Sequence, residues 1–550
     1  MKNNGTENPK TLRMTTSQSK RLRSSTGNYV TAVWIHALAW LAIILISGAF
    51  ILFGLIQWPG LHWDASLFAT PVLNVASGKG WQFGGFTPLL LTQSSEDYSF
   101  HGVLHVQIFG YLLGASTFEK LFLWSGMVNA ATFVIWTFLF HRTLHHNGRS
   151  GLIRPILFGL MAGVIALGLQ GRPEQLALLL VAIPLILREF SAPIRIFQIS
   201  QYVLIGLLFT LSPASGVLYG MGILFWLSFK YENHNNRLLW RELIVAGLIA
   251  SAVPVLIVGL FCPFSVREWI TNILFATKTA MDFSGVLFKL DRVALTGGSL
   301  YAPLWTMTVS ATAGLMAFYL LTRRKFFGFV TLVLLALYCY PRLYDYGYVA
   351  FFPLIFLFWL SRSESTQMAL AKPAGKELVM HIGTVIATLY TLVIVRLALL
   401  SILFIQQGES IADTKQKFKD LGIYGLHEGQ AAAFNVQIRP SFIVFGDGGD
   451  RFISGKGFKM NDDRRDKNLI KYEEKYQRKI EYFIYPQSYR GQPTDAFYVG
   501  QQQFELVYNG WTSESPRFLG IKLGGPMPGY QFALYRREQT LGPSPILGND

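Results

Sequence analysis

A series of long apolar segments constrains the fold of this chain more than any other feature. Val30–Ile56, Leu121–Phe140 and Leu378–Ile405 each supply enough apolar residues to cross a bilayer, which takes roughly 20 residues of helix. Hydrophobic residues make up 51% of the 550 residues and charged residues only 15%, so charges rarely interrupt these segments. The sequence therefore predicts an α-helical, polytopic membrane protein.

We expect about eleven transmembrane helices, some of them short, because short helices are tolerated inside a bundle. The long segments are Val30–Ile56, Leu121–Phe140, Leu243–Phe261, Ala302–Leu321 and Leu378–Ile405. The shorter segments are Leu152–Gln170, Gln175–Leu187, Ile196–Leu211, Gly216–Phe229, Phe326–Tyr340 and Gly347–Leu360.

Basic residues in alternate loops predict the orientation, because short cytoplasmic loops carry an excess of Lys and Arg. With residues 1–28 as a disordered basic arm in the cytoplasm, Arg142–Arg154, Arg188–Arg195 and Lys230–Arg241 are cytoplasmic loops. This pattern requires Phe100–Leu113 to lie flat in the membrane interface. The transmembrane domain then covers residues 29–405 with an external loop at 57–119, and residues 406–550 form an external soluble domain.

The region after residue 405 predicts a small α/β domain. Ser441–Gly446 and Tyr530–Arg537 are typical of strands, and Lys467–Glu481 of a charged helix. The Gly-rich run Phe445–Gly457 lacks the Lys-Ser/Thr that ends a phosphate-binding P-loop, so we interpret it as a turn.

The formal charge of +16 does not indicate nucleic acid, because the basic residues are scattered through loops and accompany no nucleic-acid-binding motif. Anionic lipid head groups and phosphates are the expected partners. We interpret Cys262 and Cys339 as buried thiols, with a disulfide between them as the alternative.

The external loop between His62 and His105 holds the main candidate site. Its two halves predict amphipathic helices that lie in the interface, the first with Val72 on its apolar side. Asp64 begins the first half, and Glu96 and Asp97 precede the second. A carboxylate at the edge of a bilayer is costly to desolvate and is therefore a functional candidate. Asp64 could also serve only as the N-cap of its helix.

Further candidates bind phosphate or sugar. Arg172 and Glu174 occupy a tight turn between two spans. Arg presents a planar, two-pronged donor set to phosphate, although an Arg–Glu pair that only closes the turn is an equal alternative. Arg342 and Tyr344 form another external cluster, for which membrane-interface anchoring is the alternative. Lys278 is one more phosphate candidate.

Two histidines open the second half of the loop. His101 and His105, at i and i+4, share a helix face and are expected to touch substrate or lipid head groups. The same spacing suits a metal ion, but no acidic third ligand is fixed by the sequence. We therefore predict no metal site and no cofactor.

Taken in order, these motifs resemble the GT-C superfamily of membrane glycosyltransferases. The matching stretches are WDASLFA with Asp64, EDYSFHGVLH with Glu96 and Asp97, and QGRPEQLALLL with Arg172–Glu174, all on one predicted side. Within the superfamily the chain resembles the bacterial lipid-linked-sugar transferases related to aminoarabinose and mannosyl transferases.

The resemblance implies an inverting glycosyltransferase that moves a sugar from a polyprenyl phosphate to a lipid or glycan acceptor of the cell envelope. It implies a bacterial inner-membrane protein with a cytoplasmic N-terminus and a periplasmic C-terminal domain. Asp64 would act as the base or orient the acceptor, with Glu96 or Asp97 as a second carboxylate. Relatives often have a second acid at the position of Ala65 and a Lys in the turn at Ser212, so these departures weaken the case for a divalent metal and for one phosphate contact.

Two other functions fit the same segments. The first is a transporter or flippase of lipid-linked glycans, although the spans hold few charged residues and no repeated halves, which transporters commonly show. The second is a catalytically inactive GT-C-like assembly subunit.

Overall fold

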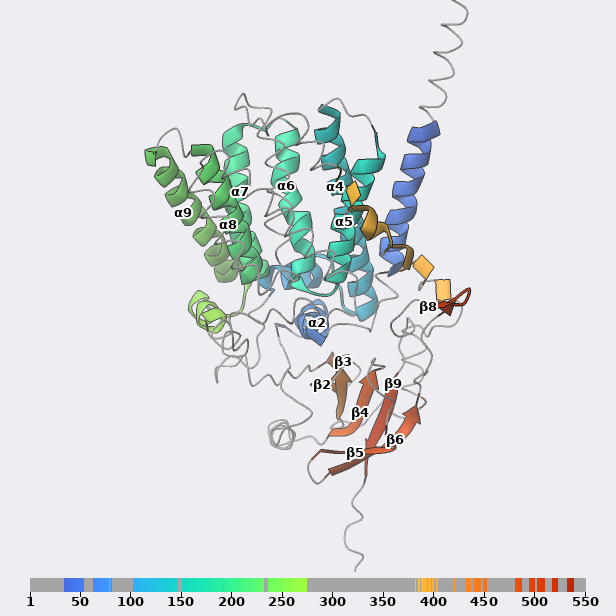
Figure 1. The fold of residues 1–550 in the computed structure, drawn as a ribbon. Helices are drawn as coiled ribbons and strands as arrows, with labels where there is room; N and C mark the ends of the chain where they lie inside the picture. The colour runs from blue at the N-terminus through green and yellow to red at the C-terminus, as the bar shows by residue number, and fades with distance from the viewer. Residues whose placement is uncertain are drawn as a thin grey trace, which may run out of the picture.

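A computed structural model gives the fold of most of the first half of the chain and of a sheet near its end. The described residues are 34–53, 63–78, 80–81, 102–146, 151–190, 192–231, 236–274, 381, 384–385, 387–392, 394–396, 398–399, 402–403, 420, 431–436, 439–446, 449–452, 480–486, 494–499, 502–509, 517–522 and 532–538. These residues form a helical bundle followed by a small sheet (Figure 1).

Long helices that run up and down make the bundle. In chain order they are Trp34–Phe53, α4 (Phe118–His146), α5 (Ile153–Gly168), α6 (Ala177–Glu189), α7 (Ile194–Leu211), α8 (Pro213–Tyr231) and α9 (Asn236–Phe261). Four described segments are long and apolar enough to cross a membrane: Trp34–Phe53, Lys120–His145, Ile194–Leu211 and Arg237–Phe261. The prediction of a helical protein compatible with a membrane is therefore confirmed at this level.

Every predicted span up to residue 261 corresponds to one of these helices, although the ends differ. Helix α9 begins at Asn236 rather than at Leu243, because its first two turns carry the polar side chains of Arg241 and Glu242 at the end of the bundle. Three predicted spans between residues 302 and 360 lie outside the described residues, and Leu378–Ile405 is described only in pieces. The total of about eleven spans stays a prediction.

Glycines let several of the helices approach closely, as small residues do in membrane bundles. A Cβ added at Gly159 of α5 would overlap Thr137 Oγ1 and lie 2.7 Å from the carbonyl oxygen of Phe133 in α4. A Cβ at Gly126 of α4 would lie 2.9 Å from Ile51 Cα in the helix Trp34–Phe53. The backbones of α5 and α4, and those of α4 and the helix Trp34–Phe53, are therefore in direct contact at these glycines.

The two ends of the bundle differ in what they carry. One end, which we call the turn end, holds residues 169–176 between α5 and α6, Ser212 between α7 and α8, and Cys262 after α9 (Figure 1). The other, which we call the arginine end, holds Arg142 and the polar first turns of α7 and α9. Successive helices alternate in direction. Consecutive turns at the same end of the bundle are therefore separated by two helices along the chain.

Short elements cover the turn end. Helix α2 (Trp63–Ala76) lies across it, and α3 (Val103–Val106) continues into the π-helix η1 (Gln107–Leu112) (Figure 1). The 3-10 helix η2 (Pro173–Leu176) forms part of the turn between α5 and α6. Helix α2 packs on η1, while α3 contacts both η2 and α7. Segments far apart in sequence therefore meet here.

The expectation of a one-sided α2 is wrong for its second half. Residues 71–75 are all buried, among them Val72 and Asn74. Five consecutive helical residues point in every direction around the axis, so protein encloses this half on all sides. The run PVLNVA holds one polar residue, Asn74, among apolar ones, so its sequence fits an enclosed helix as well as an interfacial one.

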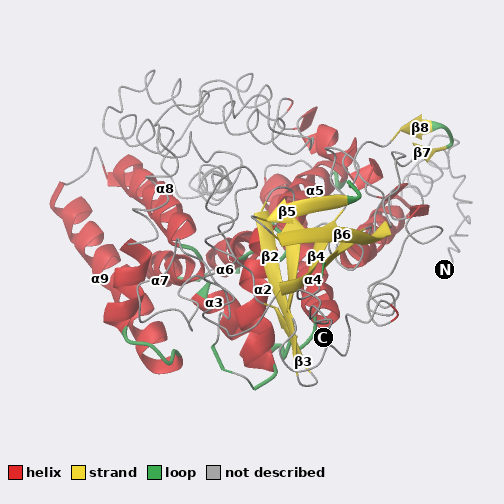
Figure 2. Cartoon of the chain, turned by 90° about the horizontal axis from the view of Figure 1, so that it is seen from below, coloured by secondary structure: helices red, strands yellow, loops and turns green. Residues whose placement is uncertain are grey.

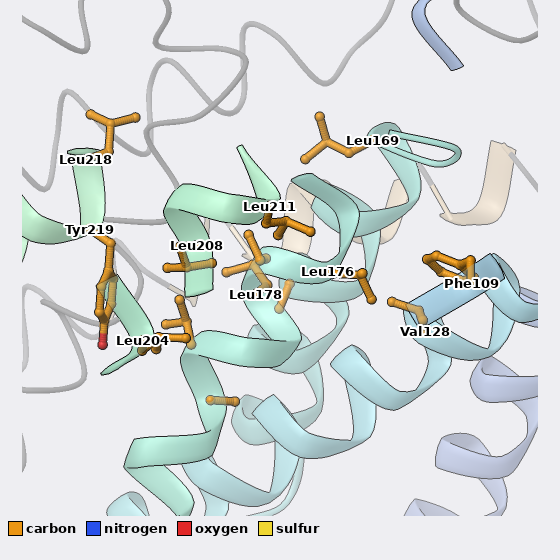
Figure 3. Close-up of a cluster of buried hydrophobic side chains, with 14 of the residues drawn as sticks. Phe109, Val128, Leu169, Leu176, Leu178, Leu204, Leu208, Leu211, Leu218 and Tyr219 are labelled. Atoms are coloured by element: carbon orange, nitrogen blue, oxygen red, sulfur yellow. The ribbon is translucent and has the colours of Figure 1, made fainter. Parts of the chain in front are cut away.

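The apolar core of the bundle extends to the turn end. Figure 3 shows Leu176 of η2, Leu211 of α7 and Phe109 of η1 in one cluster of buried side chains. This cluster anchors the turn between α5 and α6 to its neighbours through apolar contacts as well as hydrogen bonds.

A seven-stranded mixed sheet lies beyond the turn end (Figures 1 and 2). Its strand order is β3-β2-β1-β4-β9-β6-β5, and only the β1–β4 pair is parallel. The strands are β1 (Ala431–Val436), β2 (Arg439–Gly446), β3 (Gly449–Phe452), β4 (Ile480–Pro486), β5 (Ala496–Val499), β6 (Gln502–Asn509) and β9 (Phe532–Arg537), with a separate hairpin of β7 (Arg517–Phe518) and β8 (Ile521–Lys522).

The sheet confirms both predicted strands, which are β2 and β9. The Gly-rich run begins as a β2–β3 hairpin in which Gly446 pairs with Gly449, so its interpretation as a turn is also confirmed. The predicted helix Lys467–Glu481 is wrong at its last two positions, which belong to β4, because Ile480 opens the alternating run IEYFIYP. The rest of that segment lies outside the described residues.

Candidate functional site

The GRPEQ turn (residues 171–175) is the best defined part of the candidate site. Gly171 has a φ of +78°, a conformation that glycine adopts without steric cost, and Pro173 opens η2. Arg172 between them is extended, with φ −101° and ψ 152°. Nε of Arg172 donates to Oε2 of Glu174 at 3.2 Å, and the two side chains are only 10% and 5% exposed. The turn therefore holds a buried ion pair.

Gln175 fastens the turn from inside the bundle. Its Oε1 accepts a hydrogen bond from the backbone N–H of Gly171 at 3.3 Å. Its Nε2 donates to the carbonyl oxygen of Ser125 and to Oδ1 of Asn129, both at 2.8 Å and both in α4. Gln175, Ser125 and Asn129 are fully buried. The amide thus joins the start of the turn to its end and both to a neighbouring helix.

The start of α3 rests directly on this turn. Gly102, with φ +70°, precedes the helix, and a Cβ at this position would lie 2.7 Å from Pro173 Cγ. Gly102 therefore lies directly against the GRPEQ turn. His101 itself lies outside the described residues.

His105, one turn into this segment, is buried instead of facing substrate or head groups. Its side chain is fully buried, and neither ring nitrogen has a hydrogen-bond partner. The ring packs at 4.8 Å, centroid to centroid, on Phe109. Burial lowers the pKa of His105 from 6.5 to about 3, so the imidazole is neutral at physiological pH. The expectation that His105 touches substrate or lipid head groups is therefore wrong, since the bundle encloses its side chain.

Asp64 is the second residue of α2, so its backbone lies inside the first helical turn instead of at the N-cap. An acidic residue in this turn complements the partial positive charge at a helix N-terminus. Helix α2 reaches the rest of the site through η1, because a Cβ at Gly110 would lie 3.0 Å from Val75 Cγ1. The helix that carries Asp64 and the turn that carries Arg172 are thus joined through α3 and η1.

The segment after α9 borders η1 on its other side. Gln107 Nε2 donates to the carbonyl oxygen of Phe261 at 2.7 Å, and Trp81 packs edge-on against Phe264. A capping box of Ser265 and Glu268 then starts the helix at residues 266–274.

Cys262, at the start of that segment, is a free, half-buried thiol. Burial raises its pKa to about 12, so it is unreactive at neutral pH. Its predicted alternative partner, Cys339, lies outside the described residues.

The other predicted site residues cannot be placed in this geometry. Glu96, Asp97, Lys278, Arg342 and Tyr344 lie outside the described residues. The described part of the chain contains no group of three side chains arranged to hold a metal ion. The structure therefore brings together Arg172, Glu174, Gly102 and the helix that carries Asp64.

Sequence reasoning missed Gln175, Asn129 and Ser125. A signal was available, because Ser125 and Asn129 are spaced i, i+4 on one face of an otherwise apolar span. Polar residues inside a span are costly unless they find partners, and the amide after RPE supplies one. No protein-family model, curated protein or solved structure matches the chain, so its function must be argued from these residues.

Proposed function

We propose that the chain is an inverting membrane glycosyltransferase of the GT-C type. It moves a sugar from a polyprenyl phosphate to a lipid or glycan acceptor of the cell envelope. The observation that carries the proposal is the contact of Gly102 with Pro173, which joins two motifs of the resemblance that lie about 70 residues apart in sequence, at the end of the bundle where α2 also lies.

The proposed reaction is a single displacement at the anomeric carbon. The acceptor oxygen attacks that carbon from the side opposite the lipid phosphate, and the bond between the carbon and the phosphate oxygen breaks. The electron pair leaves with the phosphate, so the configuration inverts. Asp64 takes the proton from the acceptor, and Glu96 or Asp97 supplies the second carboxylate.

Arg172 has the leaving-group role in this proposal. A guanidinium matches two phosphate oxygens at once and keeps its charge at any physiological pH. Its burial beside Glu174 removes competing water, so its attraction for a developing negative charge is stronger than at an exposed site. Glu174 holds the guanidinium in one orientation through Nε.

The distribution of basic residues supports a periplasmic turn end. Arg142, Arg188, Arg195 and Arg241 all lie at the opposite, arginine end, where the positive-inside rule places the cytoplasm. The site would then face the periplasm of a bacterial inner membrane, on the same side as the C-terminal sheet.

Sugar transfer by the purified full chain in nanodiscs tests the proposal. Radiolabelled polyprenyl-phosphate sugars serve as donors and an envelope extract as acceptor. We expect transfer by the wild type and a loss of roughly a thousandfold in Asp64→Asn, because the amide keeps the shape of the side chain but cannot accept the proton.

One result would remove part of the proposal, and two others would overturn it. Equal transfer by wild type and Asp64→Asn would remove Asp64 from the mechanism. No transfer from any donor, with movement of a lipid-linked glycan across vesicle membranes, would identify a flippase; neither transfer nor movement would identify an inactive assembly subunit.

A further inference from the structure

The Gln175 side chain and the backbone hydrogen bonds of the turn together restrict the backbone around Arg172. The backbone N–H of Arg172 donates to the carbonyl of Leu169 at 3.0 Å, and its own carbonyl accepts from the N–H of Gln175 at 3.2 Å. The side-chain bond from Gly171 N–H to Gln175 Oε1 encloses the same residue from the other side. Arg172 therefore has little freedom to rotate its backbone.

The same amide also sets where the turn lies relative to the bundle. Both hydrogens of Nε2 are used, one by the carbonyl of Ser125 and one by Oδ1 of Asn129. These two acceptors lie one helical turn apart in α4, a helix otherwise joined to this region by Trp136 Nε1, which donates to the carbonyl of Leu178. The turn is thus fixed in position as well as in shape.

We infer that Gln175, acting through Asn129 and the carbonyl of Ser125, is the positioning residue that aims Arg172 at the phosphate of the lipid-linked donor. This inference rests on the proposed function. Arg172 and Glu174 are only two residues apart, so their ion pair cannot by itself fix the turn in the bundle. A bidentate contact to phosphate depends on the direction of the guanidinium. Glu174 orients the guanidinium within the turn, and the Gln175 amide fixes where the turn itself lies in the bundle.

A purely structural role for Gln175 makes a different prediction. Loss of a buried amide would then lower the thermal stability of the chain but would weaken all ligands alike. A positioning role predicts a selective loss of phosphate recognition. The useful readout is therefore the ratio of affinities for a polyprenyl phosphate and for the matching polyprenol, which lacks the phosphate.

The experiment measures this ratio with the full chain in nanodiscs. We expect the wild type to prefer the phosphate, and Gln175→Met to lower the preference about tenfold, because methionine keeps the length but makes none of the three hydrogen bonds. Arg172→Gln should lower the preference at least as much. Adding Gln175→Met to Arg172→Gln should cause no further loss, since Gln175 acts through Arg172.

Gln201→Met is the matched control. Gln201 is also fully buried and its Oε1 accepts a hydrogen bond from Tyr219, but it lies in α7 away from the turn. Its replacement should lower thermal stability and leave the preference unchanged. If Gln175→Met does not fold, Gln175→Glu replaces it: this variant keeps the acceptor for Gly171 N–H, loses the donors to α4, and should show a smaller selective loss.

The outcomes separate the inference from the proposed function. A wild type without any preference for the phosphate overturns the proposed donor and the role of Gln175 with it. A wild-type preference that survives in Gln175→Met or Gln175→Glu overturns only the positioning role. A loss that adds in full to that of Arg172→Gln would also overturn it, because Gln175 would then act independently.

Discussion

The two ends of the helix bundle each bury a glutamate beside an arginine, but the two pairs are built differently. At the arginine end, Arg195 of α7 donates to both carboxylate oxygens of Glu242 in α9, at 2.8 and 2.9 Å. Tyr202 also donates to this carboxylate at 2.9 Å, and the Arg195 side chain remains 46% exposed. At the turn end, Arg172 and Glu174 are both buried and only two residues apart.

The difference indicates two uses for the same ion pair. The Arg195–Glu242 pair joins helices that are distant in sequence, and its arginine keeps much of its hydration, so it stabilises the bundle at a small desolvation cost. The hydrogen bond between Arg172 and Glu174 links residues only two apart in sequence, and both side chains are buried away from water. A buried pair of that kind is a weak source of stability, which favours a role in binding.

The largest effect should come from breaking the pair at the arginine end. We expect Glu242→Ala to lower the free energy of unfolding by about 3 kcal/mol, because Arg195 loses its partner and the buried Tyr202 hydroxyl loses its acceptor. Chemical denaturation in detergent measures the change. Glu189→Ala is the control: the Glu189 side chain is as buried as that of Glu242, but Nε of Arg142 lies 3.7 Å from it and makes no hydrogen bond, so the loss should be about 1 kcal/mol or less. Equal losses of unfolding free energy in both variants would contradict the role of Glu242 in joining α7 to α9.

A smaller but more selective effect is expected at the turn end. In Arg172→Met/Glu174→Leu the buried pair is replaced by apolar groups of similar size, which is often neutral for stability. We expect the free energy of unfolding to stay within about 1 kcal/mol of the wild type, while sugar transfer falls roughly a hundredfold. Thermal unfolding and single-turnover transfer measure the two quantities.

The matched variant at the other end is Arg195→Met/Glu242→Leu. It should transfer sugar at the wild-type rate once folded, because the arginine end is remote from the turn. If both double variants lost sugar transfer equally, the Arg172–Glu174 pair could no longer be assigned to binding and the Arg195–Glu242 pair to stability alone.

The helices of the bundle were predictable wherever the length of an apolar run is enough to indicate a membrane span. The spans from residue 30 to residue 261 follow from runs of apolar residues, because a helix in lipid must satisfy its backbone internally whatever its neighbours are. The enclosure of α2 was not predictable in the same way. Its sequence fits either an interface or a protein interior, and only the contact of Val75 with Gly110 of η1 decides between them.

The site was predictable by residue type but not by arrangement. Arg172 and Glu174 stand out as charges in a short turn, whereas the sequence does not show that both are buried or that Pro173 rests on Gly102. His105 was misread because the i, i+4 spacing with His101 shows which residues share a face, and not what covers that face. Tertiary contacts supply that information.

His105 gives the smallest expected effect and tests how well the turn end is sealed. Its pKa is about 3 in the folded chain, against 6.5 ordinarily, so between these values the unfolded chain binds a proton that the folded chain does not. Stability is therefore lost as pH falls through 6.5, and the loss between pH 7 and pH 5 should be about 2 kcal/mol. His105→Leu should remove that part of the pH dependence, measured as the difference in unfolding free energy at the two pH values.

His145→Gln, which replaces an exposed histidine at the arginine end, is the control and should leave this pH dependence in place. An unchanged pH dependence in His105→Leu would mean that water reaches this ring in the folded chain, and the turn end would then be open to solvent beneath Gly102.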